Sequence, residues 1–387
     1  MKTSTFIPSA LFVMTTLFTL NSQANTPLKE IQKNDVVLTD GKTKIQVALL
    51  LDTSNSMDGL IDQAKSRLWN IVNTLTTLKY NGKTPDIEIA LYEYGNDGLS
   101  SESNFIRQIT PLSTDLDLLS EKLFSLRTNG GLEYCGAVIQ EATKQLKWKK
   151  DDVSMKLIYI AGNESFKQGS INYKEAISDA LNNDIYVNTI FCGGAKEGID
   201  SFWKDGADKG KGKYFNIDSN QTVRYIETPY DVKISTCNEK INATYIGYGS
   251  AGESRKRNQA VQDKNAESVS SSYAAERTLS KSSVGYRNDS WDLVDKSKGD
   301  KDAIAKIKKE ELPKELQNKS KEELKKIIDK ASKERETLQK EVGELAKKRQ
   351  EYIDQETKKT KTQDDLGNAI NSSIVAFAKI KGYTIQK

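Results

Sequence analysis

The sequence predicts an α/β protein with a doubly wound, mostly parallel sheet, Rossmann-like in its layering, followed by an all-α, helical or coiled-coil extension. In the first half, near-continuous apolar runs such as KIQVALLLD (44–52) alternate with amphipathic segments. Such runs are typical of strands that are buried on both faces, and regular alternation with helices implies right-handed crossovers and a parallel sheet. In the last quarter, charged residues around an apolar four-three spacing replace the strand patterns.

The strands and helices can be placed in order along the chain. Strand patterns occupy residues 44–52, 86–95, 105–110, 155–162, 184–194 and 213–218. Helical patterns occupy residues 58–78, 116–126, 133–147 and about 173–181. Ligands of doubly wound sheets bind at the carboxyl ends of the strands. The edge that we expect to carry function therefore collects Asp52, Gly130-Gly131 and Gly162-Asn163-Glu164.

The N-terminus has the layout of a secretory signal peptide. Lys2 precedes an apolar run from Ala10 to Leu20, and Ser22-Gln23-Ala24 is a small-x-small cleavage site. That run is too short for a membrane span, and no later run is longer. We therefore expect an exported protein, periplasmic or secreted. The predicted segments are a signal peptide (1–24), an N-terminal linker (25–42), the α/β domain (43–235), a linker with a helical segment (236–295), and a charged helical or coiled-coil extension (296–387).

Composition excludes several classes of function. The formal net charge is +4 over 387 residues, which gives no reason to expect a nucleic-acid partner. Histidine is absent, which removes Ser-His-Asp and Cys-His catalysis and imidazole-ligated zinc. Because there is also no nucleophile elbow and no phosphate-binding glycine loop, we expect a protein that is not an enzyme.

Three cysteines, Cys135, Cys192 and Cys237, leave one thiol over if a bridge forms. Cys135 and Cys192 both fall near the carboxyl edge of the predicted sheet, so a disulfide between them is the candidate. The pairs Cys192–Cys237 and Cys135–Cys237, or no bridge, are the alternatives.

A heptad-like seam runs through the charged extension. Its members are Leu324, Ile328, Ala331, Arg335, Leu338, Val342, Leu345, Arg349 and Tyr352. We favour a long helix packed as a hairpin on the preceding helical segment. A self-associating coiled coil is the alternative, and the two arginines disfavour it because each must be paired or reach water.

The segment LLDTSNSMDG (50–59) carries the clearest chemical signal. It places Asp52, Ser54 and Ser56 at alternate positions as the chain leaves a buried strand, so their side chains can converge. A carboxylate and two hydroxyls are hard oxygen donors, which suit magnesium, with manganese or calcium as alternatives. An ion with open positions can take an acidic group from a protein partner.

Asp52-Thr53-Ser54-Asn55-Ser56 after an apolar strand resembles the metal-ion-dependent adhesion site of von Willebrand factor type A domains. The resemblance covers residues 43–235 and implies a protein-binding module. The family adds a threonine from a second loop and an aspartate from a third. Here Glu133 stands near the threonine position, with Thr128 a few residues upstream.

In the third loop Ala161-Gly162-Asn163 replaces the family's Thr-Asp-Gly, and Glu164 follows. The expected metal ligands are therefore Asp52, Ser54, Ser56, Glu133 and Glu164, with Thr128 as a further candidate.

Each of these residues also has a structural interpretation. Ser54 and Ser56 can cap the helix that begins near Gly59, and Glu133 can favour the first turn of its own helix. The sequence thus predicts an exported binding module with a partly degenerate adhesion site. The alternative is a metal-independent assembly protein that oligomerises through its helical extension.

Overall fold

The computed structural model describes residues 42–217, 225–300, 302–360 and 365–386. The described residues belong to one compact unit, Lys42–Lys387. The predicted signal peptide (1–24) and nearly all of the predicted linker (25–42) lie outside the described residues.

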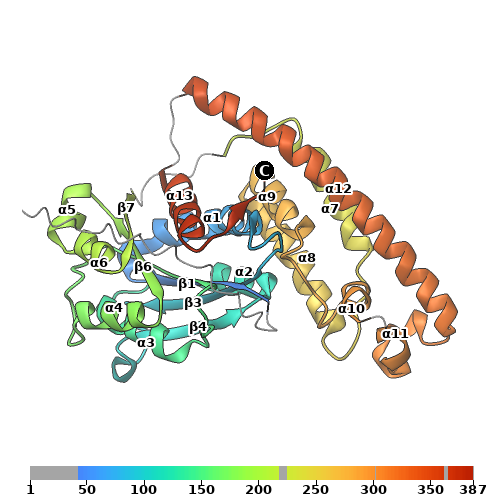
Figure 1. Ribbon diagram of the computed structural model, residues 1–387, viewed down its shortest axis with the longest axis horizontal. Helices are drawn as coiled ribbons and strands as arrows, with labels where there is room; N and C mark the ends of the chain where they lie inside the picture. The colour runs from blue at the N-terminus through green and yellow to red at the C-terminus, as the bar shows by residue number, and fades with distance from the viewer. Residues whose placement is uncertain (1–41, 218–224, 301, 361–364, 387) are drawn as a thin grey trace, which may run out of the picture. The chain divides into compact units, whose positions relative to one another are not determined.

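A six-stranded sheet forms the centre of the molecule (Figure 1). Its strand order is β4-β3-β1-β5-β6-β7, and all neighbours are parallel except the β3–β4 pair. The mostly parallel, doubly wound sheet predicted from the sequence is confirmed. The edge strand β4 is antiparallel because no helix separates it from β3. The strands are β1 (Lys44–Asp52), β3 (Asp86–Tyr94), β4 (Ile106–Ser113), β5 (Met155–Gly162), β6 (Ile185–Cys192) and β7 (Lys211–Ile217).

Strand β1 lies at the point where the winding of the sheet reverses. From β1 the chain moves outward on one side through β3 and β4, and later on the other side through β5, β6 and β7. The register pairs Asp52 with Tyr94 on β3 and Leu51 with Ala161 on β5. Three strand ends therefore meet at the carboxyl edge, where doubly wound sheets bind ligands.

Helices cover both faces of the sheet. The residues buried on one face pack against α1 (Asp58–Thr76), α2 (Leu116–Ser125) and α13 (Asp365–Ile380). Those on the other face pack against α3 (Cys135–Gln145), α4 (Tyr173–Asn182) and the start of α6 (Trp203–Lys209). Successive side chains of each strand point to opposite faces of the sheet, so each strand contributes residues to two separate cores. The short helix α5 (Ala195–Asp200) precedes α6.

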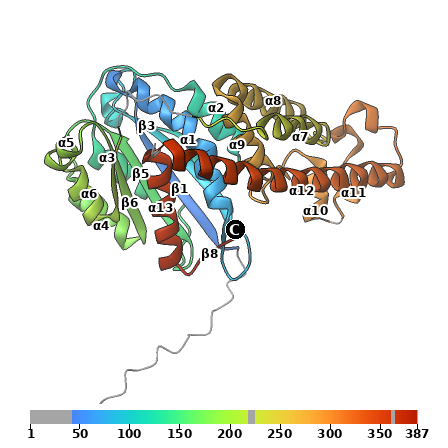
Figure 2. The ribbon, with the colours of Figure 1, turned by 90° about the horizontal axis from the view of Figure 1, so that it is seen from above.

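The C-terminal segment returns to the sheet. Ile374 and Phe377 of α13 are buried in the same core as α1, and the Ser373 hydroxyl lies 2.6 Å from the hydroxyl of Tyr159 on β5. Strand β8 (Thr384–Ile385) then pairs with β2 (Leu78–Lys79), which follows α1. Figure 2 shows α13 beside the central strands. The segment boundaries predicted from composition stay predictions, but residues 370–386 complete the core of the α/β layers.

The remaining helices form a layer outside α1 and α2. Helix α9 packs on α1, α8 packs on α2, and the long helix α12 lies along α7 and α9 (Figures 1 and 2). Their bounds are α7 (Asp231–Ala243), α8 (Gly252–Val269), α9 (Ser271–Ser282), α10 (Leu293–Gly299), α11 (Ala303–Lys306) and α12 (Lys321–Thr360). None of the helices in the described part of the chain has the length and apolar character needed to cross a membrane.

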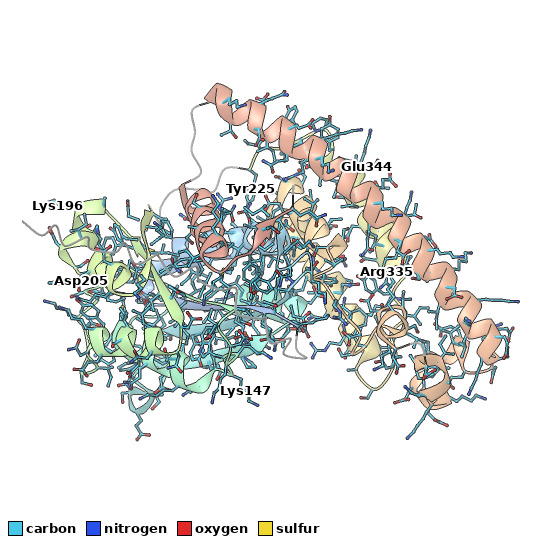
Figure 3. The ribbon with its side chains drawn as sticks, in the orientation of Figure 1. Lys147, Lys196, Asp205, Tyr225, Arg335 and Glu344 are labelled. Carbon is cyan, nitrogen blue, oxygen red and sulfur yellow. The ribbon has the colours of Figure 1, made fainter. Side chains whose placement is uncertain are left out.

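The seam of α12 faces this same chain. Arg335 is buried, and its Nη1 donates to Asp292 at 2.7 Å and to Asp295 at 2.8 Å. Arg349 is buried as well, and its Nε donates to Asp231 on α7 at 2.9 Å. Arg335 lies on the side of α12 that faces the neighbouring helices (Figure 3). A coiled coil between chains through this face would first have to displace those helices.

Two substitutions in α13 test whether this helix packs on the sheet. Phe377→Ala should lower the free energy of unfolding by about 3–5 kcal/mol, because it removes a buried aromatic ring. Ile380→Ala, on the same helix but 68% exposed, should change it by less than about 0.5 kcal/mol. Urea denaturation of both variants measures the difference, and equal effects would contradict the packing of α13 on the sheet.

The arginine pairs of α12 provide a second test. Arg335→Ala should destabilise the fold by about 3–5 kcal/mol, because it leaves the buried Asp292 carboxylate without its cation. Lys340→Ala, at an exposed position of the same helix, should be nearly silent. Chemical denaturation followed by circular dichroism compares the two variants. An Arg335→Ala protein as stable as the wild type would show that α12 is not held through this pair.

Candidate adhesion site

The predicted site residues lie where three loops meet at the carboxyl edge of the sheet. The first loop follows β1, the second connects α2 to α3, and the third follows β5. Asp52 is the last residue of β1, and its side chain is completely buried. The burial follows from its place at the end of a strand whose neighbours on both sides extend as far as it does.

The first loop brings the three predicted oxygen donors together. The amide of Ser54 donates to Asp52 Oδ1 at 2.8 Å, and the Ser54 and Ser56 hydroxyls lie 3.3 Å apart. Neither hydroxyl caps a helix: Ser54 makes no side-chain cap bond to the short turn 55–57, and the N-cap position of α1 is Met57. The helix-capping interpretation of these serines is therefore wrong. The Ser54 hydroxyl instead interacts with Asp52, and the Ser56 hydroxyl lies next to that of Ser54.

The second loop adds Glu133 to the same cluster. This side chain is 2% exposed, and the Ser54 hydroxyl interacts with both carboxyl groups. Burial, and then the neighbouring Glu133, raises the pKa of Asp52 well above its usual value. Burial also raises the pKa of Glu133, and the nearby Glu164 adds to the effect. Two buried acids this close hold a proton more strongly than either acid would alone.

One oxygen of Asp52 has no partner. Oδ2 is buried and accepts no hydrogen bond from any residue that the structure describes. A proton on either acid would supply a donor, and so would a cation. Because an unpaired buried carboxylate oxygen is costly, this atom marks the point where the site is incomplete.

The third loop explains why the family's aspartate is absent. A Cβ at Gly162 would lie 2.5 Å from the Tyr94 hydroxyl and 3.1 Å from Asp52 Oδ2, so only glycine fits. Asn163 is partly buried, and its Nδ2 donates to the Ser56 hydroxyl at 3.0 Å. The Glu164 amide donates to Glu133 Oε2 at 3.2 Å. The third loop therefore supports the cluster through an amide side chain and a backbone N–H.

Thr128 lies away from Asp52. Its hydroxyl donates to the carboxylate of Asp58 in the first turn of α1. Glu133 occupies the second-loop position beside Asp52 instead. The structure thus brings Asp52, Ser54, Ser56 and Glu133 together, places the Glu164 backbone beside them, and gives Thr128 a different partner.

The predicted disulfide between Cys135 and Cys192 does not form. All three cysteines are free and buried. Cys135 Sγ lies 3.8 Å from the Tyr94 hydroxyl, directly behind the acid pair. Burial raises the pKa of both the Cys135 and the Cys192 thiol well above its usual value. A protonated thiol is a poor partner for disulfide exchange.

Sequence reasoning missed two residues that shape the site. Tyr94 places its hydroxyl between Gly162 and Cys135 and donates to the Ala161 carbonyl at 2.9 Å. Asn96 binds the carbonyl of Thr53 and the carbonyl of Arg127, which holds the first and second loops together. The position of Tyr94 at the end of a buried strand was the available signal.

The donor set matches a hard divalent cation. Within the described ranges, no three His, Cys, Asp or Glu side chains gather as a metal group, so carboxylates alone do not make this site. The donor set is mixed, with the carboxyl groups of Asp52 and Glu133, the Ser54 hydroxyl near both, and the Ser56 hydroxyl 3.3 Å from that of Ser54. Magnesium and manganese prefer such oxygen donors, and they complete their shells with water or an added ligand.

No protein-family model matches the chain, and no curated protein matches it. Several solved structures do. BatB from Bacteroides thetaiotaomicron is 17% identical, over 45% of this chain and 90% of BatB, with a TM-score of 0.35. The SpRpn10 VWA domain is 16% identical, over 45% of this chain and 87% of that domain, with a TM-score of 0.32. Residues 44–217 form the mostly parallel, doubly wound sheet that the resemblance to von Willebrand factor type A domains implies.

Two features of this chain agree with the type A pattern. Strand β1 lies at the switch point of the sheet, and Asp-x-Ser-x-Ser begins with the last residue of β1. Relative to the type A pattern, this chain carries one carboxylate on a different loop. Gly162 has replaced the third-loop aspartate, while Glu133 brings a carboxylate from the second loop.

The acid pair predicts an unusual mutational effect in metal-free protein. The pKa values of both acids are higher in the folded state than in the unfolded state, so folding favours their protonated forms. The stability that the pair contributes is complete below the usual carboxyl pKa and is lost as pH rises through the raised pKa values. Asp52→Asn should therefore be more stable than the wild type at about pH 8, with the difference shrinking toward about pH 4.

Thermal denaturation in a chelator across this pH range measures the effect. Asp117→Asn is the matched control, since that buried acid is paired with Arg277 and its loss should destabilise. An Asp52→Asn protein less stable than the wild type throughout would contradict the account of the pair.

Proposed function

We propose that this protein is an exported protein-binding module whose type A domain holds a divalent cation and through it binds an acidic group of a protein partner. Asp52, Ser54, Ser56 and Glu133 would hold the ion, with magnesium as the expected metal and Glu164 near enough to assist. A bound ion supplies open coordination positions that a partner's carboxylate can occupy. The proposal is one of binding and not of catalysis.

The proposal rests on one difference among the buried acids, namely whether a basic side chain is paired with each of them. Asp117, Asp231, Asp263 and Asp292 each form an ion pair with a buried arginine or lysine, and Glu93 pairs with Arg107. Among the described residues, Asp52 and Glu133 have no such cation. Two adjacent buried carboxylates that no arginine or lysine neutralises are suited to bind a cation.

The residues of the site have separate roles in this proposal. Asp52 offers its buried Oδ2, which has no donor among the described residues, and Glu133 supplies the second carboxyl group. Ser54 and Ser56 present hydroxyl oxygens that no helix cap uses. Asn163 fixes the Ser56 hydroxyl through its amide. Glycines at positions 95 and 162 allow the neighbouring loops to approach Asp52 closely.

The packing of α12 counts against the alternative function, a metal-independent protein that assembles through its helical extension. The seam that would self-associate is buried against α7, α9 and α10 of the same chain. Export remains part of the proposal, supported by the signal-peptide pattern at residues 1–24.

Thermal stability in magnesium tests the metal site. Wild-type protein should be stabilised over the same protein in chelator, by about 2.7 kcal/mol when the free ion is about a hundredfold above its Kd. The gain should grow as pH rises through the raised pKa values of the pair, because the ion binds the ionised acids. Differential scanning calorimetry measures it.

Asp52→Ala and the double variant Ser54→Ala/Ser56→Ala should lose this gain, whereas Ser103→Ala, at an exposed serine of another turn, should keep it. A peptide with a single aspartate should bind the wild type in magnesium, and the same peptide with asparagine should not. An equal response to magnesium in Asp52→Ala and wild type would reject the site.

A further inference from the structure

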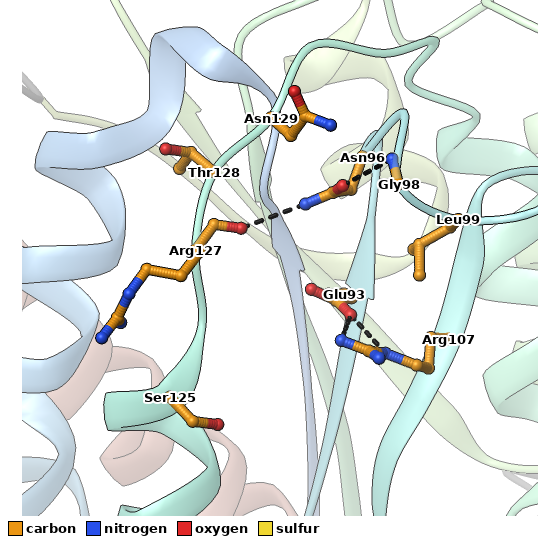
Figure 4. A pocket seen from close by; sticks show the side chains of 9 residues that line it. All are labelled: Glu93, Asn96, Gly98, Leu99, Arg107, Ser125, Arg127, Thr128 and Asn129. Atoms are coloured by element: carbon orange, nitrogen blue, oxygen red, sulfur yellow. Dashed lines mark hydrogen bonds and ion pairs between the residues drawn. The ribbon is translucent and has the colours of Figure 1, made fainter.

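A cavity lies near the candidate site, and Figure 4 shows the side chains that line it. Its volume is about 330 Å³, and it lies between the end of β3, the loop at residues 96–99 and the second loop at residues 125–129. Glu93 and Arg107 point toward one another in its wall. The metal-binding proposal does not use this cavity.

The Glu93–Arg107 pair differs from the other buried ion pairs. Glu93 is buried, and both Nε and Nη2 of Arg107 bind its Oε1. The Arg107 side chain is nevertheless 59% exposed, whereas the cations that pair with the other buried acids are themselves buried. Glu93 thus fixes one edge of a guanidinium whose remaining donors, at Nη1, have no partner among the described residues. An arginine held in this way is preorganised to bind a carboxylate.

The charge of the cavity favours an anion. One carboxylate, that of Glu93, and two guanidinium groups, those of Arg107 and Arg127, belong to its lining residues. Arg127 forms no ion pair with any described carboxylate. Its Nη1 donates to the carbonyl oxygens of Phe124 and Leu126, and its guanidinium points away from Glu93 (Figure 4). Arg127 therefore contributes positive potential, while Arg107 offers the direct contact.

The cavity and the candidate metal site share their loops. Thr53 lies between Asp52 and Ser54, and its hydroxyl donates to Glu93 Oε2 at 3.4 Å. The Asn129 amide donates to the Thr53 carbonyl at 2.9 Å. The side-chain amide of Asn96 connects Thr53 to the Arg127 carbonyl. The same turn therefore contacts the cavity on one side and the candidate metal site on the other.

We propose that Arg107 binds a second acidic side chain of the same protein partner. The partner would then be recognised through two acids, one on each side of the turn that follows β1. This proposal rests on the proposed function for the first acid. The expected partner is a peptide segment with two carboxylates separated by a spacer. The two contacts act on one ligand, so the second contact raises affinity by making its binding intramolecular.

The test uses synthetic peptides with two aspartates joined by glycine linkers of graded length, and matched peptides in which one aspartate is asparagine. Isothermal titration calorimetry is carried out with the full chain in magnesium. With the best linker, the two-acid peptide should bind at least about tenfold more tightly than the one-acid peptide.

Arg107→Lys should remove that gain, because lysine keeps the charge that Glu93 needs but loses the planar fork. Arg255→Lys is the control, since Arg255 also pairs with one acid, Asp115, outside this cavity. A two-acid peptide that binds no more tightly than the one-acid peptide at any linker length overturns the proposal. So does a gain that survives in Arg107→Lys.

A second measurement separates this proposal from the metal proposal. Acetate, added to isotope-labelled protein in chelator, should shift the Arg107 Nε–H signal in the wild type. If the one-acid peptide shows no magnesium dependence but acetate moves this signal, the metal proposal fails and the cavity proposal holds. If acetate leaves the Arg107 signal unmoved, the cavity proposal fails whatever the peptides do.

Discussion

Asp52 and Glu133 impose the constraint that organises the carboxyl edge of this sheet. Both acids are buried, and one oxygen of Asp52 has no hydrogen-bond donor in the described part of the chain. Burying charge in this way is costly unless a proton or a cation compensates. The surrounding loops do not relieve that cost. Glycine at position 162 brings the third loop up to Asp52, and Ser54 interacts with both acids. The site therefore stays poised for an external positive charge.

The rest of the molecule shows how this chain treats buried acids elsewhere. Asp117 and Asp263 share Arg277 where α2, α8 and α9 meet, and Lys281 adds a further cation to Asp263. On α12, Arg335 forms an ion pair with Asp292, and Arg349 forms one with Asp231. These pairs explain why arginine occupies two positions of an otherwise apolar seam. They join α12 to α7 and α10, while the Asp117–Arg277 pair ties α9 to α2 of the α/β layers. Against this pattern, the uncompensated acids at the sheet edge are the exception.

Much of the fold could be predicted because its signals are local. The apolar run at residues 44–52 predicted a buried strand, and the strand–helix alternation predicted a parallel sheet with Asp52 at its carboxyl edge. The proximity of Ser54 to Asp52, and of the Ser56 hydroxyl to that of Ser54, agrees with the alternate spacing of these residues. The return of α13 to the sheet could not be predicted in this way, since it depends on contacts between residues roughly three hundred positions apart, such as Asn70 and Asn371. The role of Gly162 likewise depends on Tyr94, a neighbour only in space.

The central claim is that a divalent cation belongs between the two buried acids, and its position can be measured directly. Crystals of the full chain grown with manganese, together with a small carboxylate, allow the ion to be located by anomalous scattering. The account predicts a peak bound by Asp52 and the Ser54 and Ser56 hydroxyls, with Glu133 beside it. A map with no peak there, while Asp52 and Glu133 stay paired through a shared proton, would contradict it.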